Sequence, residues 1–284
     1  MLDIRRDMMR PAARLVPLPL HNQARKILII VRARGLTPAD VIAASFPKAG
    51  STWLRFMIAD LTVQGGAADF ATIARLSPPL GQHHAAPRLI EDHGRFIKTH
   101  ESFSAFTRFP ARALYVVRDG RDVAVSMYHY LRRRGVYSGP FDDYLDAFLA
   151  GRVVNYGSWQ DHVRAWLSAV AQHPERIAVL RYEDLLQAGG AETLQGTLAK
   201  IGWAVPIEAA RAAVERNSLD SMRLKESRTD VSVWRMKDAS SSPAVPFVRA
   251  GRAEQWKEQF TENQMQRFRA KAGSALQLAG YPTG

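Results

Sequence analysis

Short apolar runs alternate with longer amphipathic stretches along most of the chain. The runs that predict β-strands lie at residues 41–45, 95–100, 113–117 and 176–182. Helices are predicted from residue 51 to about 65, from residue 122 onward, and at residues 141–149, 159–170, 193–201, 207–214 and 262–278. A further helix is predicted to open at residues 183–186 and to be stopped by Gly189 and Gly190. Because strands that alternate with helices form parallel sheets, we predict an α/β fold, a single domain with a central parallel sheet flanked by helices.

The first predicted strand leads through a short polar loop into a helix. Residues 41–45 are followed by Phe-Pro-Lys-Ala-Gly and then by Ser51 and Thr52, which are natural N-cap residues. Gly50 permits a sharp turn, and Lys48 lies in the loop toward which the positive end of the helix points. This strand-loop-helix unit, which is similar to a P-loop, predicts a site for a phosphate or sulfate group.

The order of residues in this loop differs from that of nucleoside triphosphatases. In their P-loop the Lys directly follows the last Gly, whereas here Lys48 precedes Gly50 by two residues. A nucleoside triphosphatase is therefore disfavoured. On this stretch alone, an ordinary strand-to-helix turn with a solvated Lys is the alternative, so the other motifs must decide.

Two further strands end in basic residues. Strand 95–100 brings Lys98 and His100 to its carboxyl end, which is where ligands bind in open α/β sheets. Strand 113–117 runs into Arg118 and a helix that also carries Ser126, so both side chains can present donors to one anion.

Two acidic residues follow Arg118 closely, and they allow a second interpretation of this turn. We expect Asp122 to cap the helix. The alternative is a local ion-pair network, which is plausible for Arg121 and Asp122 but leaves Arg118 unexplained.

Composition narrows the class of protein. The chain has 284 residues, 46% of them hydrophobic, and no Cys, which excludes disulfides and permits a reducing compartment. The longest early apolar run, residues 27–31, is too short to span a bilayer or to act as a signal sequence, so a cytoplasmic location is expected. Lys and Arg outnumber Asp and Glu by 39 to 27, and the net charge of +12 indicates an anionic partner.

The N-terminal part differs from the rest of the chain. We interpret residues 1–40 as a basic arm and lead-in segment and residues 41–284 as the domain itself. The arm is either a solvated tail or a contact for a membrane surface or a partner.

Two later segments lack a regular pattern. Residues 66–95 are expected to form an irregular loop on the surface or on the acceptor side, and the His83-His84 pair within it is weak evidence for a metal site. Residues 223–246 are polar and form either a substrate loop or a disordered segment.

Five motifs in a fixed order resemble those of a known enzyme family. They are Pro-Lys-Ala-Gly-Ser-Thr-Trp, Lys-Thr-His, Val-Val-Arg-Asp-Gly-Arg-Asp-Val-Ala-Val-Ser, Arg-Tyr-Glu-Asp-Leu, and Phe-Val-Arg-Ala-Gly followed by Trp-Lys. Over residues 41–270 this set resembles the cytosolic-type sulfotransferase family, and the chain looks like a bacterial member of it. The resemblance implies an α/β domain that binds 3′-phosphoadenosine 5′-phosphosulfate and moves its sulfuryl group to a hydroxyl or an amine.

The resemblance also implies a role for each matching residue. The implied ligands of the 5′-phosphosulfate are Lys48, Gly50, Ser51 and Thr52. Those of the 3′-phosphate are Arg118, Ser126, Arg249 and Gly251. Those of the adenine are Trp53, Tyr182, Asn217, Ser218, Leu219 and Met222.

The chain departs from the family pattern at three places. Leu219 replaces the usual aromatic residue, which weakens the expected stacking on the adenine, and Ala250 replaces a common Lys. The dimerisation pattern of animal members is broken at Glu262 and Gln266, so the oligomeric state stays open.

The chemistry of sulfuryl transfer fits the same residues. Transfer needs in-line positioning and positive charge at the oxygen that leaves, tasks suited to Lys48 and Lys98. The acceptor hydroxyl must lose a proton, and the unperturbed pKa of His100 suits a base at neutral pH. No metal is required, and no cluster of Asp, Glu and His has metal-ligand spacing.

Two alternatives from other classes remain. A nucleotide or small-molecule kinase would share the anion loop but should show Gly-Lys-[Ser/Thr] and an acidic partner for magnesium. A nucleic-acid-binding protein would explain the net charge, yet the basic residues are scattered and no nucleic-acid-binding motif is present. Residues 64–95, 130–158 and 223–246 are compatible with a saccharide, glycolipid, phenol or peptide as the acceptor. Among small-molecule, saccharide and lipid-linked hydroxyls, the basic arm and the lack of a dominant aromatic cluster favour a saccharide or a lipid-linked acceptor.

Overall fold

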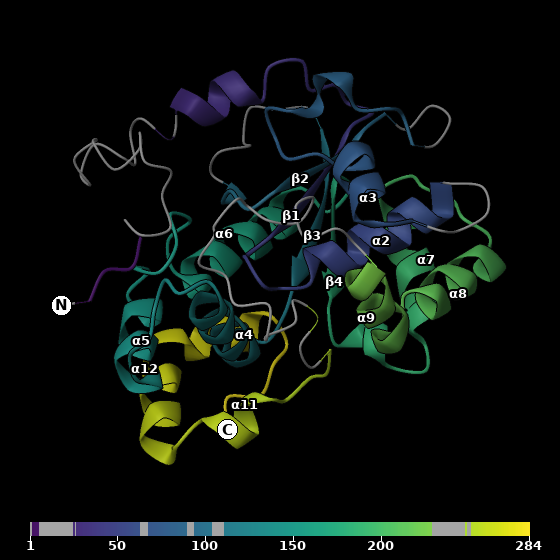
Figure 1. Ribbon diagram of the computed structural model, residues 1–284. Coiled ribbons are helices and arrows are strands. Elements are labelled where there is room, and N and C mark those ends of the chain that lie inside the picture. Colours follow the sequence, from purple (N-terminus) through teal and green to yellow (C-terminus); the bar gives the residue numbers. More distant parts are fainter. Residues whose placement is uncertain are drawn as a thin grey trace.

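Four parallel strands form the centre of the molecule in the order β2-β1-β3-β4 (Figure 1). The computed structural model describes residues 2–5, 25, 27–62, 68–89, 94–103, 111–228, 248 and 251–284. The strands are β1 (Val41–Ser45), β2 (Phe96–Thr99), β3 (Arg112–Val117) and β4 (Ile177–Arg181). All three strand pairings within this sheet are parallel, which confirms the predicted fold class.

Helices cover both faces of the sheet (Figure 1). On one face lie α2 (Ser51–Thr62), α7 (Gly190–Lys200) and α8 (Ile207–Arg216). On the other lie α4 (Gly120–Arg133), α5 (Phe141–Leu149), α6 (Trp159–Gln172) and α12 (Glu262–Leu278). Val41 and Ala43 pack with the first set and Ile42 and Ala44 with the second. Successive strand residues point to opposite faces, so burial on both sides explains why β1 is apolar throughout.

Shorter elements complete the described structure. They are α3 (Phe70–Leu76), the 3₁₀ turns η2 (His83–Ala85) and η4 (Asp184–Leu186), α9 (Leu219–Arg228) and α11 (Trp256–Gln259). The helices at residues 141–149 and 262–278 have the predicted bounds. At the second of these, Thr261 and Gln264 form a capping box that satisfies two amide groups of the first turn.

Three predictions about local structure were wrong. Residues 66–95 are not irregular throughout, because α3 begins at the N-cap Asp69, whose side chain accepts a hydrogen bond from the amide of Thr72. Gly190 begins α7 instead of ending a helix, and a Cβ at this position would lie 2.4 Å from the carbonyl oxygen of Leu185. His83 is buried, not on a surface loop, and accepts a hydrogen bond from the amide of Gly81.

The amino ends of β1 and β2 are joined by an ion pair. Asp40, directly before β1, accepts hydrogen bonds from the amide and Nε of Arg95 at 2.9 Å each and from its Nη2 at 2.6 Å. Burial raises the pKa of Asp40, but the hydrogen bonds from Arg95 and Thr37 outweigh burial and lower that pKa to about 2.

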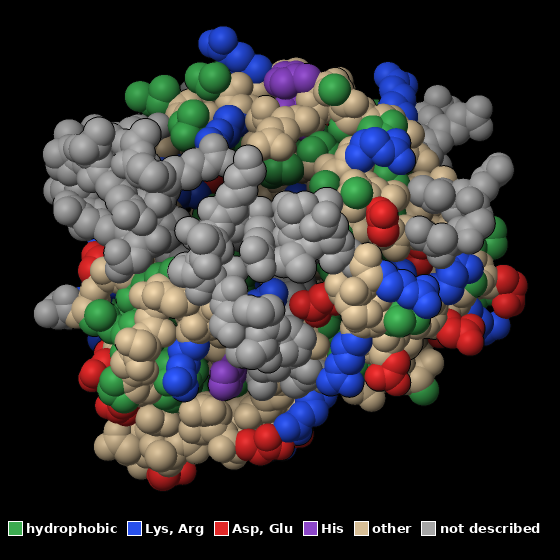
Figure 2. All heavy atoms as spheres, viewed as in Figure 1, with side chains coloured by type: hydrophobic (Ala, Val, Ile, Leu, Met, Phe, Trp, Pro, Cys, Tyr) green, Lys and Arg blue, Asp and Glu red, His purple; other side chains and the backbone are tan. Residues whose placement is uncertain are grey.

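The segment before β1 both buries and exposes apolar side chains. Residues 27–32 are helical, and Ile29 is buried in the core cluster that contains Ile42. Four large aliphatic side chains on this helix are exposed, namely Ile27 (65%), Leu28 (43%), Ile30 (50%) and Val31 (46%). Figure 2 shows hydrophobic side chains beside Lys and Arg at the upper left, where Figure 1 draws the purple helix.

Candidate active site

The loop between β1 and α2 has the backbone of an anion site. Lys48 adopts the left-handed region with φ 71°, which is uncommon for a residue with a side chain and costs about 1–3 kcal/mol. Gly50 has φ 101°, and a Cβ at this position would lie 2.5 Å from the ring of Tyr182. The carbonyl of Gly50 accepts the first helical hydrogen bond, from Leu54. The first amides of α2 therefore point into a turn that only a compact backbone can form.

His100 follows β2 and lies directly beside the end of β1. Its Nδ1 is 2.7 Å from the carbonyl oxygen of Ser45. Because a carbonyl oxygen only accepts hydrogen bonds, Nδ1 must carry the proton, and Nε2 of the neutral ring is then free of one. Burial, and after it the charge of Lys98, lowers the pKa of His100 well below 6.5. The ring is thus a neutral imidazole with a basic Nε2 at neutral pH.

Lys98 lies within β2 and has a strongly perturbed pKa. Burial, and after it the positive charge of Arg55, lowers the pKa of the Lys98 amine from 10.5 to about 8. No ion pair with an Asp or Glu joins Lys98 or Arg55 in the described ranges. These two cations lie beside the neutral ring of His100 at the carboxyl end of β2, and an anionic ligand there would stabilise their charged forms.

The loop between β3 and α4 corrects two predictions. Asp119, not Asp122, caps α4 and forms an ion pair with Arg121, with 2.6 Å between Nη2 and Oδ2. Asp122 instead accepts hydrogen bonds from the amides of Glu254 and Trp256. It therefore ties the late loop at residues 251–256 to the start of α4, a contact that spans more than half of the domain.

Arg118 is buried at this loop and lies over the ring of Tyr182, with 4.3 Å between Cζ and the ring centroid. Its Nη2 donates to the carbonyl oxygen of Arg252 at 3.1 Å and lies 3.4 Å from Asp122. Its Nε is buried without a hydrogen-bond partner among the described residues. A buried guanidinium N–H that lacks an acceptor is the feature expected of an anion site.

Residues of α4 line the space next to this loop. The Nζ of Lys48 lies 4.7 Å from the centroid of the Tyr130 ring, and Ser126 is one helical turn earlier on the same helix. The structure therefore brings Lys48, Ser126 and Arg118 to the carboxyl end of the sheet.

The residues assigned to the adenine also lie together. The Nε1 of Trp53 donates to the carbonyl oxygen of Asn217 at 2.6 Å, and its ring meets that of Tyr182 edge-on at 5.3 Å. Met222 is buried in the apolar cluster beneath Trp53. Trp53 and Tyr182 thus come from α2 and the end of β4 to form one aromatic corner.

The remaining assigned residues lie at the start of α9 and in the late loop. The Oγ of Ser218 lies 3.0 Å from that of Ser221 at the exposed start of the helix. Leu219 packs on Gly251 so closely that a Cβ there would lie 2.2 Å from its Cδ1, so Gly251, with φ 59°, cannot be replaced without movement. Arg249 lies outside the described residues.

Sequence reasoning missed two residues at this edge. Arg55 in α2 is an Arg in a mostly apolar helix, and only its burial beside Lys98 marks it. Glu183 accepts hydrogen bonds from the amide of Asp119 at 3.0 Å and from the hydroxyl of Tyr281 at 2.6 Å. Its position directly after Tyr182 in the Arg-Tyr-Glu-Asp-Leu motif was the available signal.

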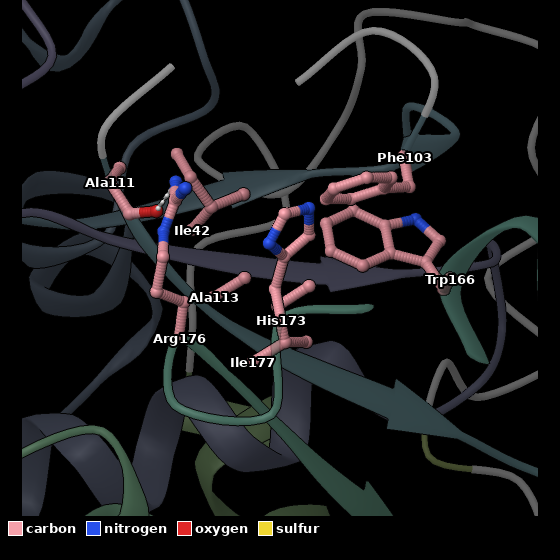
Figure 3. Close-up of a pocket in the computed structure, with 8 residues that line it drawn as sticks. All are labelled: Ile42, Phe103, Ala111, Ala113, Trp166, His173, Arg176 and Ile177. Carbon is pink, nitrogen blue, oxygen red and sulfur yellow. Dashed lines mark hydrogen bonds between the residues drawn. The ribbon is translucent and has the colours of Figure 1, made fainter. Parts of the chain in front are cut away.

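A small cavity lies at the opposite end of the sheet (Figure 3). Ile42, Ala113 and Ile177, from the amino ends of three strands, line it together with Trp166 and His173. Its volume of about 20 Å³ is room for one water molecule, not for a substrate. The candidate site is therefore at the carboxyl ends of the strands, where polar groups converge. Within the described residues no group of three or more His, Asp or Glu is arranged to hold a metal ion.

The fold and these loops define a class of protein, an α/β protein with two strand-loop-helix units whose geometry suits anionic groups. The family model for the sulfotransferase domain matches residues 38–280. The chain therefore belongs to the sulfotransferase family and is a sulfotransferase, as the sequence motifs predict.

Relatives match over most of the chain. Sulfotransferase 1A1 of Bos taurus is 30% identical over 98% of this chain and 97% of its own length. Sulfotransferase 1B1 of Mus musculus is 31% identical over 82% of this chain and 81% of its own. These comparisons do not favour a kinase or a nucleic-acid-binding protein.

Solved structures share the fold. A mouse sulfotransferase, SULT7A1, in complex with PAP has a TM-score of 0.67 at 23% identity and covers 89% of both chains. Retinol dehydratase in complex with retinol and PAP has a TM-score of 0.69 at 18% identity and covers 87% of this chain and 83% of its own. At these identities the likeness supports the fold alone.

Proposed function

We propose that this sulfotransferase transfers the sulfuryl group of 3′-phosphoadenosine 5′-phosphosulfate to a hydroxyl of a small molecule, with His100 as the base. The observation that supports this most directly is the contact between Nδ1 of His100 and the carbonyl oxygen of Ser45. It leaves Nε2 able to accept a proton, and it places the ring beside the loop that carries Lys48.

The residues at the carboxyl edge fit this donor. The amides of residues 50–52 and the side chain of Lys48 would hold the phosphosulfate at the start of α2. Arg118, whose Nε lacks an acceptor, and Ser126 would hold the 3′-phosphate together with Gly251 and Arg249. The corner of Trp53 and Tyr182, with Leu219 and Met222 nearby, would hold the adenine. Two structural neighbours are complexes with PAP, which supports this assignment.

The side chains divide the chemical step between them. The bound donor supplies a sulfuryl group whose bond to a phosphate oxygen breaks as its bond to the acceptor oxygen forms. Nε2 of His100 takes the proton of the acceptor hydroxyl. Lys48 and Lys98 stabilise the negative charge on the oxygen that leaves. That no metal takes part stays a prediction.

Groups beside His100 support a polar acceptor. The ring of Tyr156 meets that of His100 edge-on at 5.5 Å, and the guanidinium of Arg25 lies 4.4 Å from the Tyr156 centroid. Arg25 in turn makes two hydrogen bonds with Glu101, at 2.7 and 2.8 Å. Charged groups so near the proposed base favour a hydroxyl-rich acceptor, such as a saccharide, over a purely apolar one. That the chain is a bacterial member of the family and acts in the cytoplasm stays a prediction.

Two measurements test the proposed function. A radiolabelled sulfuryl donor supplied with a panel of saccharide, lipid-linked, phenolic and amine acceptors should label a hydroxyl acceptor. By calorimetry, adenosine 3′,5′-bisphosphate should bind at least tenfold more tightly than adenosine 5′-phosphate, because each charge-assisted contact to the 3′-phosphate contributes about 1.5–3 kcal/mol. Equal affinities would contradict the assignment of Arg118 and Ser126.

The exposed helix at residues 27–32 supports a further part of this proposal, contact with an anionic membrane surface. Its exposed aliphatic side chains lie next to Arg32 and Arg34, which are exposed as well. Apolar side chains beside basic ones match an interface of acyl chains and negatively charged headgroups. In the described part of the chain no helix is long and apolar enough to cross a bilayer, so the contact would be peripheral.

Sedimentation with vesicles tests this contact. The parent should bind vesicles that contain phosphatidylserine more strongly than vesicles of phosphatidylcholine alone, and the double variant Ile27→Ser, Ile30→Ser should lose this binding. Leu278→Ser is the matched control, since Leu278 is 52% exposed on α12 and should not matter. Equal binding by all three proteins would refute the contact. A dimer of the parent that the double variant abolishes would assign the helix to a second copy instead.

A further inference from the structure

Arg55 has an environment that is costly for a cation. It lies on α2, one turn after Ser51, and is 8% exposed. Burial lowers its pKa to about 10, and no ion pair with an acidic residue compensates for burial in the described part of the chain. Its Nε is buried there without a hydrogen-bond partner. A Leu or Met at this position would avoid these costs, so the guanidinium must contribute something else.

The guanidinium joins α2 to the segment that borders Lys98. Its Nη2 donates to the carbonyl oxygens of Ile73 and Ser77, both at 2.7 Å, and so holds the end of α3. The chain then passes alongside β2, where the amide of Lys98 donates to Pro78 and the carbonyl of Lys98 accepts from Leu80, both at 2.9 Å.

These contacts connect Lys98 to α2, the helix that follows the loop of Lys48 and Gly50. β1 lies on one side of β2 and residues 78–80 lie on the other. Arg55 binds the carbonyl of Ser77, the residue directly before the segment 78–80 that hydrogen-bonds with Lys98. Arg55 therefore fixes the position of Lys98 relative to α2.

The charge of Arg55 acts on Lys98 and His100. The guanidinium faces Lys98, and its positive charge adds to burial in lowering the pKa of the Lys98 amine. Three cationic or titratable side chains face His100, namely Lys98, His162 and Arg55, while the carbonyl of Ser45 opposes them. Removing Arg55 should therefore let both pKa values rise.

We propose that Arg55 is a positioning residue for sulfuryl transfer, which places Lys98 beside the loop between β1 and α2. The inference rests on the proposed function, since Lys98 and His100 take part in that reaction. It adds a residue of the first helix that does not itself touch the reacting atoms.

The test compares Arg55→Met, which removes the charge, with Arg55→Lys, which keeps the charge but loses the guanidinium that binds the carbonyls of Ile73 and Ser77. The control is Arg176→Met, because Nη2 of Arg176 likewise donates to a backbone carbonyl, that of Ala111, at the amino end of the sheet. Two readouts are kcat/KM against pH and the affinity for adenosine 3′,5′-bisphosphate. The third is the pKa of Lys98, obtained by mass spectrometry from the pH dependence of its rate of labelling with an amine-reactive reagent.

In the parent, activity should fall below the pKa of His100 and above that of Lys98, which is about 8. For Arg55→Met we expect the alkaline limb of the profile, and the Lys98 pKa from labelling, to move up by about 0.5–1 pH unit. The acid limb should move in the same direction but less, because Arg55 contributes least among the groups that lower the pKa of His100. For Arg55→Lys we expect unshifted limbs and a kcat about 3- to 10-fold lower, because Lys98 is less well placed. Arg176→Met should match the parent in all readouts.

Several outcomes would overturn the proposal. An unchanged Lys98 pKa in Arg55→Met, or a loss of kcat with an unshifted profile and a lower melting temperature, would make Arg55 a structural residue only. If Arg55→Met does not fold, a parent-like kcat in Arg55→Lys would also overturn it. The labelling experiment does not depend on activity. A shifted Lys98 pKa in a protein that transfers no sulfuryl group would contradict the proposed function and leave the electrostatic link between Arg55 and Lys98 intact.

Discussion

Strands β1 and β2 have ionisable groups at both ends. The charged form of these groups is stabilised at the amino end and destabilised at the carboxyl end. At the amino end, Asp40 and Arg95 are joined by three hydrogen bonds, and the pKa of Asp40 falls to about 2. At the carboxyl end, Lys98 and His100 lie near another cationic side chain, Arg55, and their pKa values fall because charge is disfavoured there.

The same direction of pKa shift thus has opposite meanings. For a carboxyl group a lowered pKa means that the charged form is stabilised by the fold, whereas for an amine or an imidazole it means that the charged form is destabilised. At the amino end, the ion pair of Asp40 and Arg95 stabilises the fold. The carboxyl end keeps an electrostatic deficit that an anionic ligand can remove, which is typical of a functional site.

Replacing His100 by Ala should have the largest effect on the carboxyl end. Turnover should fall by about 10²–10⁴-fold, the usual contribution of a positioned base, while affinity for adenosine 3′,5′-bisphosphate and the melting temperature stay near those of the parent. The matched control is His173→Ala, at the edge of the small cavity, which should retain turnover. Retained turnover in His100→Ala with any acceptor would refute the base, and a parallel loss of nucleotide affinity would point to a role in loop shape.

Removing the charge of Lys48 should have the next largest effect. Lys48→Ala should lower turnover by roughly 100-fold or more, because a preorganised charge next to the leaving oxygen is lost. Since φ is 71° at this residue, Lys48→Gly removes the charge and also relieves the backbone strain, so it separates the two contributions. Single-turnover kinetics measure both variants, and Lys200→Ala, an exposed Lys at the end of α7, is the control. Near-normal turnover in folded Lys48→Gly would make the loop a structural turn.

At the amino end, Asp40→Asn should affect stability alone. The free energy of unfolding should fall by about 2 kcal/mol at pH 7, as expected when a carboxyl group whose pKa is 3.8 unfolded and about 2 folded loses its charge. In the parent this contribution is complete above pH 3.8 and is lost as the pH falls through about 2.

Urea unfolding and turnover on the same sample check this expectation. The control is Asp142→Asn, whose partner Arg267 lies on the surface, and this change should cost no more than about 1 kcal/mol. If Asp40→Asn lowered turnover at a temperature where it is folded, the two ends of the strands would not be independent.

The sequence predicts the sheet and the long helices well for identifiable reasons. The helices at residues 141–149 and 262–278 have clear amphipathic periodicity, and β1 and β3 are continuous apolar runs between turns. The five motifs place the site residues on loops that the parallel sheet brings to one edge. The roles of those residues stay predictions.

The misses have physical reasons as well. The seven residues of α3 are too few for a clear period between segments rich in Gly, Pro and His. Asp122 makes its main contacts with amides more than 130 residues away, and local sequence cannot show this. Arg55 has the same difficulty, because an Arg in a helix is usually solvated, and only the packing of α3 against α2 buries it.

The contact of Tyr281 with Glu183 bears on how the protein can be handled. Tyr281 is three residues before Gly284, yet its hydroxyl donates to the carboxylate of Glu183, which also accepts a hydrogen bond from the amide of Asp119 in the loop between β3 and α4. The last residues are therefore not a dispensable tail, and trimming them or fusing a bulky tag to this end would disturb a loop proposed to bind the donor. Affinity tags belong at the other terminus or on a spacer that leaves Tyr281 in place.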